Sequence, residues 1–154
     1  MSAIDGLKIT PLKTVGDERG KVMRMLRSDD PHFTGFGEAY FSVINPGVTK
    51  GWKTHLRTVQ NLAVPHGRIT FILRDDRPGS PTAGQATKIV LSAEDPKLYR
   101  LLSVPPGVGY AWRNESDSPS VVANCQAPEP HDPTESVNAP LDENPPDWEG
   151  TPEG

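Results

Sequence analysis

The sequence has very little cysteine and no long apolar run. Its single cysteine, Cys125, excludes an internal disulfide framework and fits a reducing compartment. No apolar stretch is long enough to span a membrane, and no hydrophobic region of the signal-peptide type stands at the N-terminus. We therefore expect a cytoplasmic protein without a membrane partner. Its 154 residues are enough for one domain with its own core.

Basic residues are missing from the last part of the chain. No Lys or Arg follows Arg113, and residues 127–154 carry eight acidic residues and seven prolines. The net charge of −4 does not suggest a nucleic-acid partner, whereas the mildly basic first part could favour a small anion. We divide the chain into a body, residues 1–126, and an acidic, proline-rich tail, residues 127–154. The tail either packs on the body through Trp148 or is partly disordered.

Convincing helical periodicity is also absent. Short segments with apolar residues and regular turn signals predict an all-β sandwich or barrel. Pro11 restricts the first segment to the edge of a sheet. The predicted strands lie near residues 7–14, 21–26, 38–44, 50–56, 59–64, 67–74, 86–92, 98–103, 109–113 and 119–126.

Two stretches have spacings that resemble the two motifs of cupins, which fold as a double-stranded β-helix jelly roll. The first motif is matched by Gly47, His55 and Gly67, and the second by Pro105, Gly107 and Asn114. The usual metal-ligand positions carry Lys53, His55, Gln60 and Tyr110. A metal site needs three or four convergent His or carboxylate ligands, so we predict that no metal binds here.

The same four positions would line a barrel with a lysine, an imidazole, an amide and a phenol. This set suits proton transfer next to a carbonyl: Lys53 or His55 can take a proton, Tyr110 can return one, and a cation can stabilise an enolate. Each residue also has a purely structural interpretation. Lys53 could be solvated, His55 a satisfied core histidine, Gln60 a strand-pairing residue and Tyr110 a packing residue. Their joint motif spacing favours a shared pocket.

Several stretches resemble the dTDP-4-dehydrorhamnose 3,5-epimerase family of cupins. They occur in the family's order within residues 7–148, and the series Asp75, Arg77, Ser80, Pro81, Thr82 followed by a late PPG is the most specific. The matching stretches are DERG (17–20), GVTKGWKTH (47–55), VPHGRITFILRDDRPGSPTAG (64–84), IVLSAEDPKLYRLLSVPPGVGYAW (89–112) and HDPTE (131–135).

The resemblance implies a jelly roll, usually a homodimer whose N-terminal strands cross between subunits. The implied substrate is a nucleoside-diphosphate 4-keto-6-deoxy sugar. The implied reaction removes protons at C3 and C5 and returns them to the other face without a cofactor. Arg19 matches a family arginine that reaches the diphosphate. Lys50 stands where the family has a second arginine and would bind phosphate as a point charge.

The catalytic positions depart from the family pattern. The family's catalytic histidine falls on Lys53 and its oxyanion-stabilising lysine on Gln60. Its acid tyrosine falls near Pro130 or His131, and the carboxylate that orients its histidine would lie beyond Trp148, in a segment that this sequence does not contain.

Lys53 could act as base or carbonyl polariser, with His55, Tyr110 or His131 as partner. We therefore favour an epimerase or isomerase that acts on a nucleotide-linked keto sugar. The alternatives are a non-catalytic cupin that binds a sugar nucleotide or another small anion, and a different metal-free enzyme such as a lyase or cyclase.

Overall fold

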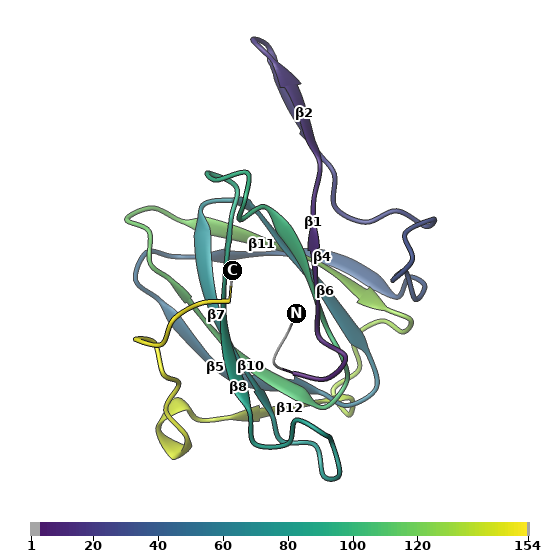
Figure 1. The fold of residues 1–154 in the computed structure, drawn as a ribbon, viewed down its shortest axis with the longest axis vertical. Coiled ribbons are helices and arrows are strands. Elements are labelled where there is room, and N and C mark those ends of the chain that lie inside the picture. Colours follow the sequence, from purple (N-terminus) through teal and green to yellow (C-terminus); the bar gives the residue numbers. More distant parts are fainter. Residues whose placement is uncertain (1–3, 154) are drawn as a thin grey trace.

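The computed structural model describes residues 4–153, and its regular secondary structure is almost entirely antiparallel β-strand (Figure 1). The prediction of an all-β barrel or sandwich is confirmed. The elements are β1 (Lys8–Pro11), β2 (Thr14–Asp17), β3 (Gly20–Met23), β4 (Glu38–Ile44), β5 (Thr49–His55), β6 (Val59–His66), β7 (Arg68–Asp75), β8 (Ala86–Ser92), β9 (Arg100–Val104), β10 (Val108–Asn114), β11 (Ser120–Ala127), β12 (Ser136–Ala139) and a 3-10 helix, η1 (Leu141–Glu143).

Two five-stranded sheets face each other. One has the order β1-β9-β6-β11-β4 and the other β12-β5-β10-β7-β8, while β2 and β3 form a separate ribbon that projects from the barrel (Figure 1). Alternation along each strand directs one set of side chains inward, and these form the main core. Its members include Ile44, Leu62, Phe71, Leu91 and Leu102, all almost fully buried.

The predicted strands at 38–44 and 86–92 coincide with β4 and β8, and most others differ only at their ends. The N-terminal segments differ more. The predicted strand at 7–14 ends at Pro11, where β1 leaves its partner β9, and the chain then enters the ribbon. The predicted strand at 21–26 ends at Met23, because Met25 and Leu26 leave the ribbon to pack near Tyr99.

The tail contributes a strand that the sequence did not predict. Strand β12 pairs with β5, so that Ser136 lies opposite His55 and Asn138 opposite Lys53. Beyond it, the tail crosses the outer face of the same sheet. The carbonyl of Trp148 accepts a hydrogen bond from Lys88 Nζ at 2.5 Å, and the Arg113 guanidinium lies 4.1 Å from the centre of the Trp148 ring. Residues 136–153 therefore share a sheet and a packed face with the body.

The series that begins at Asp75 has a structural role. The buried Asp75 carboxylate accepts hydrogen bonds from Arg77 Nε at 2.8 Å, Ser80 Oγ at 2.6 Å and Thr82 Oγ1 at 2.6 Å. The Arg77 side chain in turn fills the space beside Gly107. A Cβ there would lie 2.7 Å from Arg77 Cγ, and Gly107 has a φ of +86°. Because Gly107 N–H donates to the His55 carbonyl at 2.7 Å, this cluster supports the end of β5.

We predict that Asp75→Asn lowers the free energy of unfolding by about 1–3 kcal/mol at neutral pH. The Arg77 hydrogen bond is the largest influence and holds the Asp75 pKa well below its ordinary value, against the effect of burial. The stabilisation from ionised Asp75 is thus present above the unfolded pKa of about 3.9 and is lost as pH falls through the folded pKa. Urea denaturation at pH 7 and pH 3 measures both effects. Asp76→Asn, which alters an exposed pair with Arg74, is the control and should change little; equal stability of all three proteins would contradict the assignment.

Candidate active site

A pocket of about 360 Å³ lies between the two sheets. Tyr40 and Ser42 of β4 line it from one sheet. From the other sheet it is lined by Lys50 and Lys53 of β5, Tyr110 and Trp112 of β10, and Asn138 of β12. The pocket therefore has a phenol on each side and two lysines on one side.

A β-bulge explains how both lysines reach this pocket. Tyr110 pairs with Lys53, but the next paired residue on the same face, Trp112, pairs with Lys50, so β5 has one residue more than β10 between these two pairs. In a regular strand, side chains three residues apart point to opposite faces of the sheet. The extra residue in β5 shifts this alternation, so that Lys50 and Lys53 point to the same face. Lys50 Nζ lies 5.9 Å from the centre of the Trp112 ring near the pocket opening.

His55 lies deeper along β5 and is paired with a carboxylate from the tail. Its Nδ1 is hydrogen-bonded to Glu135 Oε1, and Glu135 Oε2 accepts a hydrogen bond from Thr58 Oγ1 at 3.0 Å. Both His55 and Glu135 are buried, with 2% and 0% exposure. Since an ionised carboxylate can only accept, His55 carries its proton on Nδ1 and presents the lone pair of Nε2.

The protonation states fit this arrangement. Burial lowers the pKa of His55 below its ordinary value, and the hydrogen bond to Glu135 offsets only part of that effect. Burial raises the pKa of Glu135, but hydrogen bonds from His55 and Thr58 outweigh it, so that the net pKa is lowered. At neutral pH the pair therefore consists of a neutral imidazole and an ionised carboxylate.

Tyr110 connects this pair to the pocket. Its hydroxyl lies 3.5 Å from His55 Nε2, a long separation of the kind that often shortens in the reactive complex. The two rings are nearly parallel, at 15°. Burial raises the pKa of Tyr110 far above its ordinary value, so the phenol is neutral and can donate to His55. The arrangement is a chain from Glu135 through His55 to the hydroxyl of Tyr110, and Tyr110 is one of the residues that line the pocket.

Gln60 belongs to a second chain of hydrogen bonds, which also ends at Glu135. Gln60 is fully buried; its Nε2 donates to Thr58 Oγ1 at 2.8 Å, and its Oε1 accepts from Asn124 Nδ2 at 2.7 Å. Asn124 Nδ2 also donates to the Tyr40 hydroxyl at 2.9 Å. Both polar atoms of the Gln60 amide are thus engaged within the protein. The residue is placed to hold Thr58 and Glu135, rather than in the pocket lining where we expected a substrate contact.

The remaining predicted residues, Arg19 and His131, do not line the pocket of this chain. Arg19 stands in the turn between β2 and β3, in the ribbon that projects from the barrel (Figure 1). Its side chain is 83% exposed and pairs with Asp17 at 2.6 Å. His131 is exposed and its backbone N–H donates to Glu38 Oε1 at 2.8 Å. The structure therefore brings together Lys50, Lys53, His55 and Tyr110, but neither Arg19 nor His131 lines the pocket.

Sequence reasoning missed Glu135 and Tyr40. Glu135 ends the stretch HDPTE, which resembled the family, but the orienting carboxylate was expected beyond Trp148. Tyr40 lies in a correctly predicted strand, and its alternation with the exposed Phe41 could have identified it as inward-facing.

Two other kinds of site are not found among residues 4–153. No three His, Cys, Asp or Glu side chains in this range are close enough together to hold a metal ion. The same residues form no helix with the length and apolar character that are needed to cross a bilayer.

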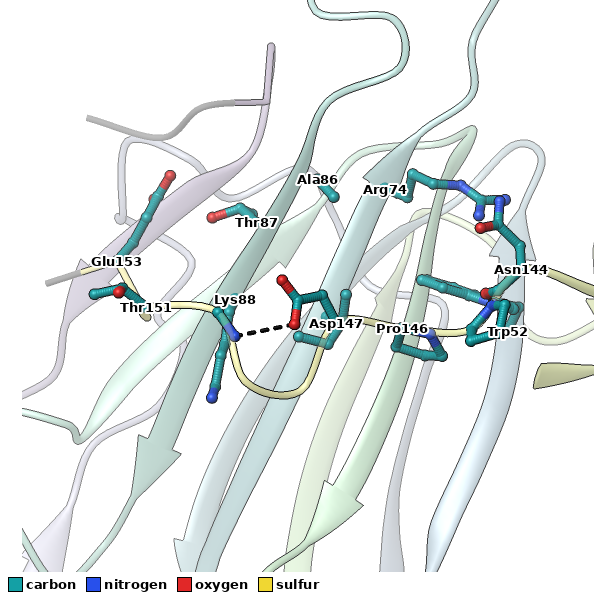
Figure 2. A pocket seen from close by; sticks show the side chains of 13 residues that line it. Trp52, Arg74, Ala86, Thr87, Lys88, Asn144, Pro146, Asp147, Thr151 and Glu153 are labelled. Carbon is teal, nitrogen blue, oxygen red and sulfur yellow. Dashed lines mark hydrogen bonds between the residues drawn. The ribbon is translucent and has the colours of Figure 1, made fainter. Parts of the chain in front are cut away.

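A second pocket, of about 410 Å³, lies on the outside of the sheet beneath the tail (Figure 2). Its charged groups are engaged in holding the tail and the sheet surface. Arg74 pairs with Asp76 at 2.7 Å, Lys88 holds the Trp148 carbonyl, and Asp147 accepts from Gly150 N–H at 3.1 Å. The pocket between the sheets, with its proton-transfer groups, is therefore the candidate active site.

The fold and this pocket define a cupin-type jelly roll with acid–base groups inside the barrel. Residues 1–144 match the family described as dTDP-4-dehydrorhamnose 3,5-epimerase, and the chain belongs to that family. The predicted jelly roll and the family resemblance are thus confirmed, and the family supports an enzyme of the isomerase class.

Individual relatives agree with this assignment. A dTDP sugar isomerase from Desulfovibrio desulfuricans G20 is 40% identical, with a TM-score of 0.89 and coverage of 97% of this chain and 94% of its own. A 3,5-epimerase from Legionella pneumophila in complex with dTDP-4-keto-L-rhamnose is 25% identical, with a TM-score of 0.78 and coverage of 89% and 74%. The probable low-salt glycan biosynthesis epimerase Agl13 of Haloferax volcanii is 29% identical over 126 residues, or 80% of this chain and 79% of its own.

We predict that His55 titrates below the ordinary histidine pKa of about 6.5, with its proton on Nδ1. Glu135→Gln should lower the pKa further, because the carboxylate raises it in the wild type. Ring ¹⁵N NMR across a pH series measures both the pKa and the tautomer. Glu129→Gln, which removes an exposed carboxylate from the same tail, should leave the His55 signals unchanged. A His55 pKa at or above the ordinary value would contradict the proposed charge state.

Proposed function

We propose that this protein is an isomerase that moves protons next to the ketone of a dTDP-linked 4-keto-6-deoxy sugar. The observation that carries the proposal is the Glu135–His55–Tyr110 chain, which ends at a pocket lined by Lys53. Family membership supports the reaction class, and the ligand of the Legionella relative supports the substrate class.

Tyr110 and His55 act together as the base. The Tyr110 oxygen takes a proton from the carbon beside the ketone while its own proton passes to His55 Nε2. The electron pair of the broken C–H bond forms the enolate. Glu135 stabilises the imidazolium that results, since its ionised carboxylate is hydrogen-bonded to Nδ1. The direct partner of the buried carboxylate is His55 rather than Lys53, which favours the imidazole as the final proton acceptor.

The two lysines provide positive charge at different places. Lys53 pairs with Tyr110 across β5 and β10, so its ammonium can stabilise the enolate oxygen that forms next to the phenol. Lys50 is exposed at the opening and can bind the diphosphate as a point charge. This division gives the sugar the deeper part of the pocket and places the nucleotide toward solvent.

We further propose a homodimer in which Arg19 serves the pocket of the partner. Phe41 and Val43 expose 74% and 64% of their surface on the outer face of β4, and Val15 and Val22 are exposed on the projecting ribbon. Large apolar side chains exposed in this way would be covered in a protein–protein interface. A second copy of this chain is the simplest partner, because β2 and β3 pair with each other and with no other strand within residues 4–153. The prediction of a cytoplasmic, metal-free enzyme is retained.

We predict that the protein exchanges solvent deuterium into C3, C5 or both carbons of dTDP-4-keto-6-deoxyglucose, as measured by NMR in D₂O. His55→Asn and Tyr110→Phe should each lower the exchange rate by about 100-fold or more, the usual contribution of a positioned acid–base group. His66→Asn, at the exposed end of β6, is the control and should exchange normally. A binding titration runs in parallel. Binding without exchange would favour the non-catalytic cupin. The absence of both binding and exchange would show that the ligand class is wrong.

The proposed dimer predicts complementation between two defective chains. Arg19→Ala should weaken sugar-nucleotide use, and His55→Asn should abolish proton transfer. When the two are co-expressed with different tags, a mixed dimer regains one intact pocket, formed by the His55 of one chain and the Arg19 of the other. With random pairing this restores about a quarter of wild-type activity. No recovery in isolated mixed dimers would show that Arg19 does not serve the partner's pocket.

A further inference from the structure

Inversion at a carbon needs proton-transfer groups on both faces of the substrate. The Tyr110 hydroxyl and His55 Nε2 lie 3.5 Å apart, and the two residues come from the adjacent strands β10 and β5 of one sheet. Lys53 also lies on β5. Two groups in hydrogen-bond contact cannot lie on opposite sides of a carbon, because the substrate itself must fit between them. A proton that returns to the other face must therefore come from the sheet across the pocket.

We propose that Tyr40 is the catalytic acid that returns this proton. Tyr40 lies on β4, the edge strand of the opposite sheet, and lines the same pocket as Tyr110. The inference rests on the proposed function and names the second proton-transfer group of that reaction. Ser42 also lines the pocket from β4, but an alcohol is a far weaker acid than a phenol. His131, the other acid that the sequence suggested, is exposed and does not line the pocket.

The direction of the hydrogen bonds leaves the Tyr40 proton free. The ionised Glu135 carboxylate can only accept, so Thr58 must donate its single hydroxyl proton to it. Thr58 Oγ1 is then the acceptor for Gln60, which fixes the nitrogen of the Gln60 amide toward Thr58 and its oxygen toward Asn124. Asn124 must therefore direct its side-chain nitrogen, Nδ2, toward the Gln60 oxygen.

Tyr40 contacts that same Asn124 nitrogen at 2.9 Å, so the Tyr40 oxygen accepts this hydrogen bond. Its own O–H proton has no acceptor among residues 4–153 and is available to a substrate in the pocket. Burial raises the pKa of Tyr40 above its ordinary value, so the phenol retains this proton until the enolate forms.

The step balances without any other reagent. The C=C electron pair of the enolate forms the new C–H bond with the Tyr40 proton, the Tyr40 O–H bond breaks, and the ketone is restored. Tyr40 becomes a phenolate that keeps the hydrogen bond from Asn124, while Tyr110 holds the proton taken from the substrate and His55 holds the proton that Tyr110 gave up. His55 then releases one proton to solvent water and the Tyr40 phenolate takes one up, which restores the starting state. When the reaction runs backward, Tyr40 removes the proton and the Tyr110–His55 pair returns one.

Tyr40→Phe separates the two halves of the reaction. The ring is retained, so we expect a thermal midpoint close to that of the wild type. In D₂O, the variant should still exchange deuterium into the recovered substrate through Tyr110 and His55. Formation of the inverted product should fall by about 100-fold or more. Tyr99→Phe, which removes a phenol hydroxyl that donates to the Arg24 carbonyl outside the pocket, should form the product at the wild-type rate.

The outcomes distinguish this inference from the function on which it rests. Wild-type product formation in Tyr40→Phe would overturn the assignment of Tyr40 alone. Loss of both exchange and product in a folded Tyr40→Phe protein would also overturn it, because Tyr40 would then be needed for proton removal. A wild-type protein that binds the sugar nucleotide without any exchange would overturn the proposed function and this inference together.

Discussion

The contact between Glu135 and His55 is the interaction on which the site depends. It joins residues 80 positions apart and ties the acidic tail to the barrel. The backbone supports the same junction, since Leu56 N–H donates to the Glu135 carbonyl at 2.6 Å and β12 pairs with β5 just beyond it. A buried carboxylate without this partner and Thr58 would be costly, so orientation of the imidazole and docking of the tail are one event. The tail is thus part of the pocket, to which it also contributes Asn138.

Several features that look functional in the sequence instead hold the strand that carries the chemistry. The Asp75 cluster fixes Arg77, Arg77 packs on Gly107, and Gly107 N–H binds the carbonyl of His55. At the other end of β5, the bulge turns Lys50 back toward the pocket. The end of β5 that carries His55 is therefore held in place. Such rigidity matters because proton transfer depends on distances that must be kept within a few tenths of an ångström.

Alternation and turn signals were enough to predict most of the barrel, and motif spacing was enough to predict the jelly roll. The grouping of Lys53, His55 and Tyr110 was also predictable, because cupin motifs place these positions on neighbouring strands. Glu135 was not, since it lies in a proline-rich segment without periodicity and its contact is long-range. The inward position of Lys50 depends on a bulge that leaves no mark on hydrophobic periodicity. The engagement of Gln60 by Thr58 and Asn124 required knowledge of which polar groups are buried together.

The position of the imidazole has a consequence for the chemistry. The family resemblance implies a catalytic histidine at position 53, where this chain has lysine, and the imidazole stands at position 55 instead. Two residues along a strand keep the same face but move a side chain by roughly 7 Å. Tyr110 spans this gap, because it pairs with Lys53 in register while its hydroxyl reaches His55 Nε2. An imidazole that acts through a phenol can therefore lie deeper in the barrel. Position 53, nearer the opening, can then carry the lysine whose ammonium stabilises the enolate.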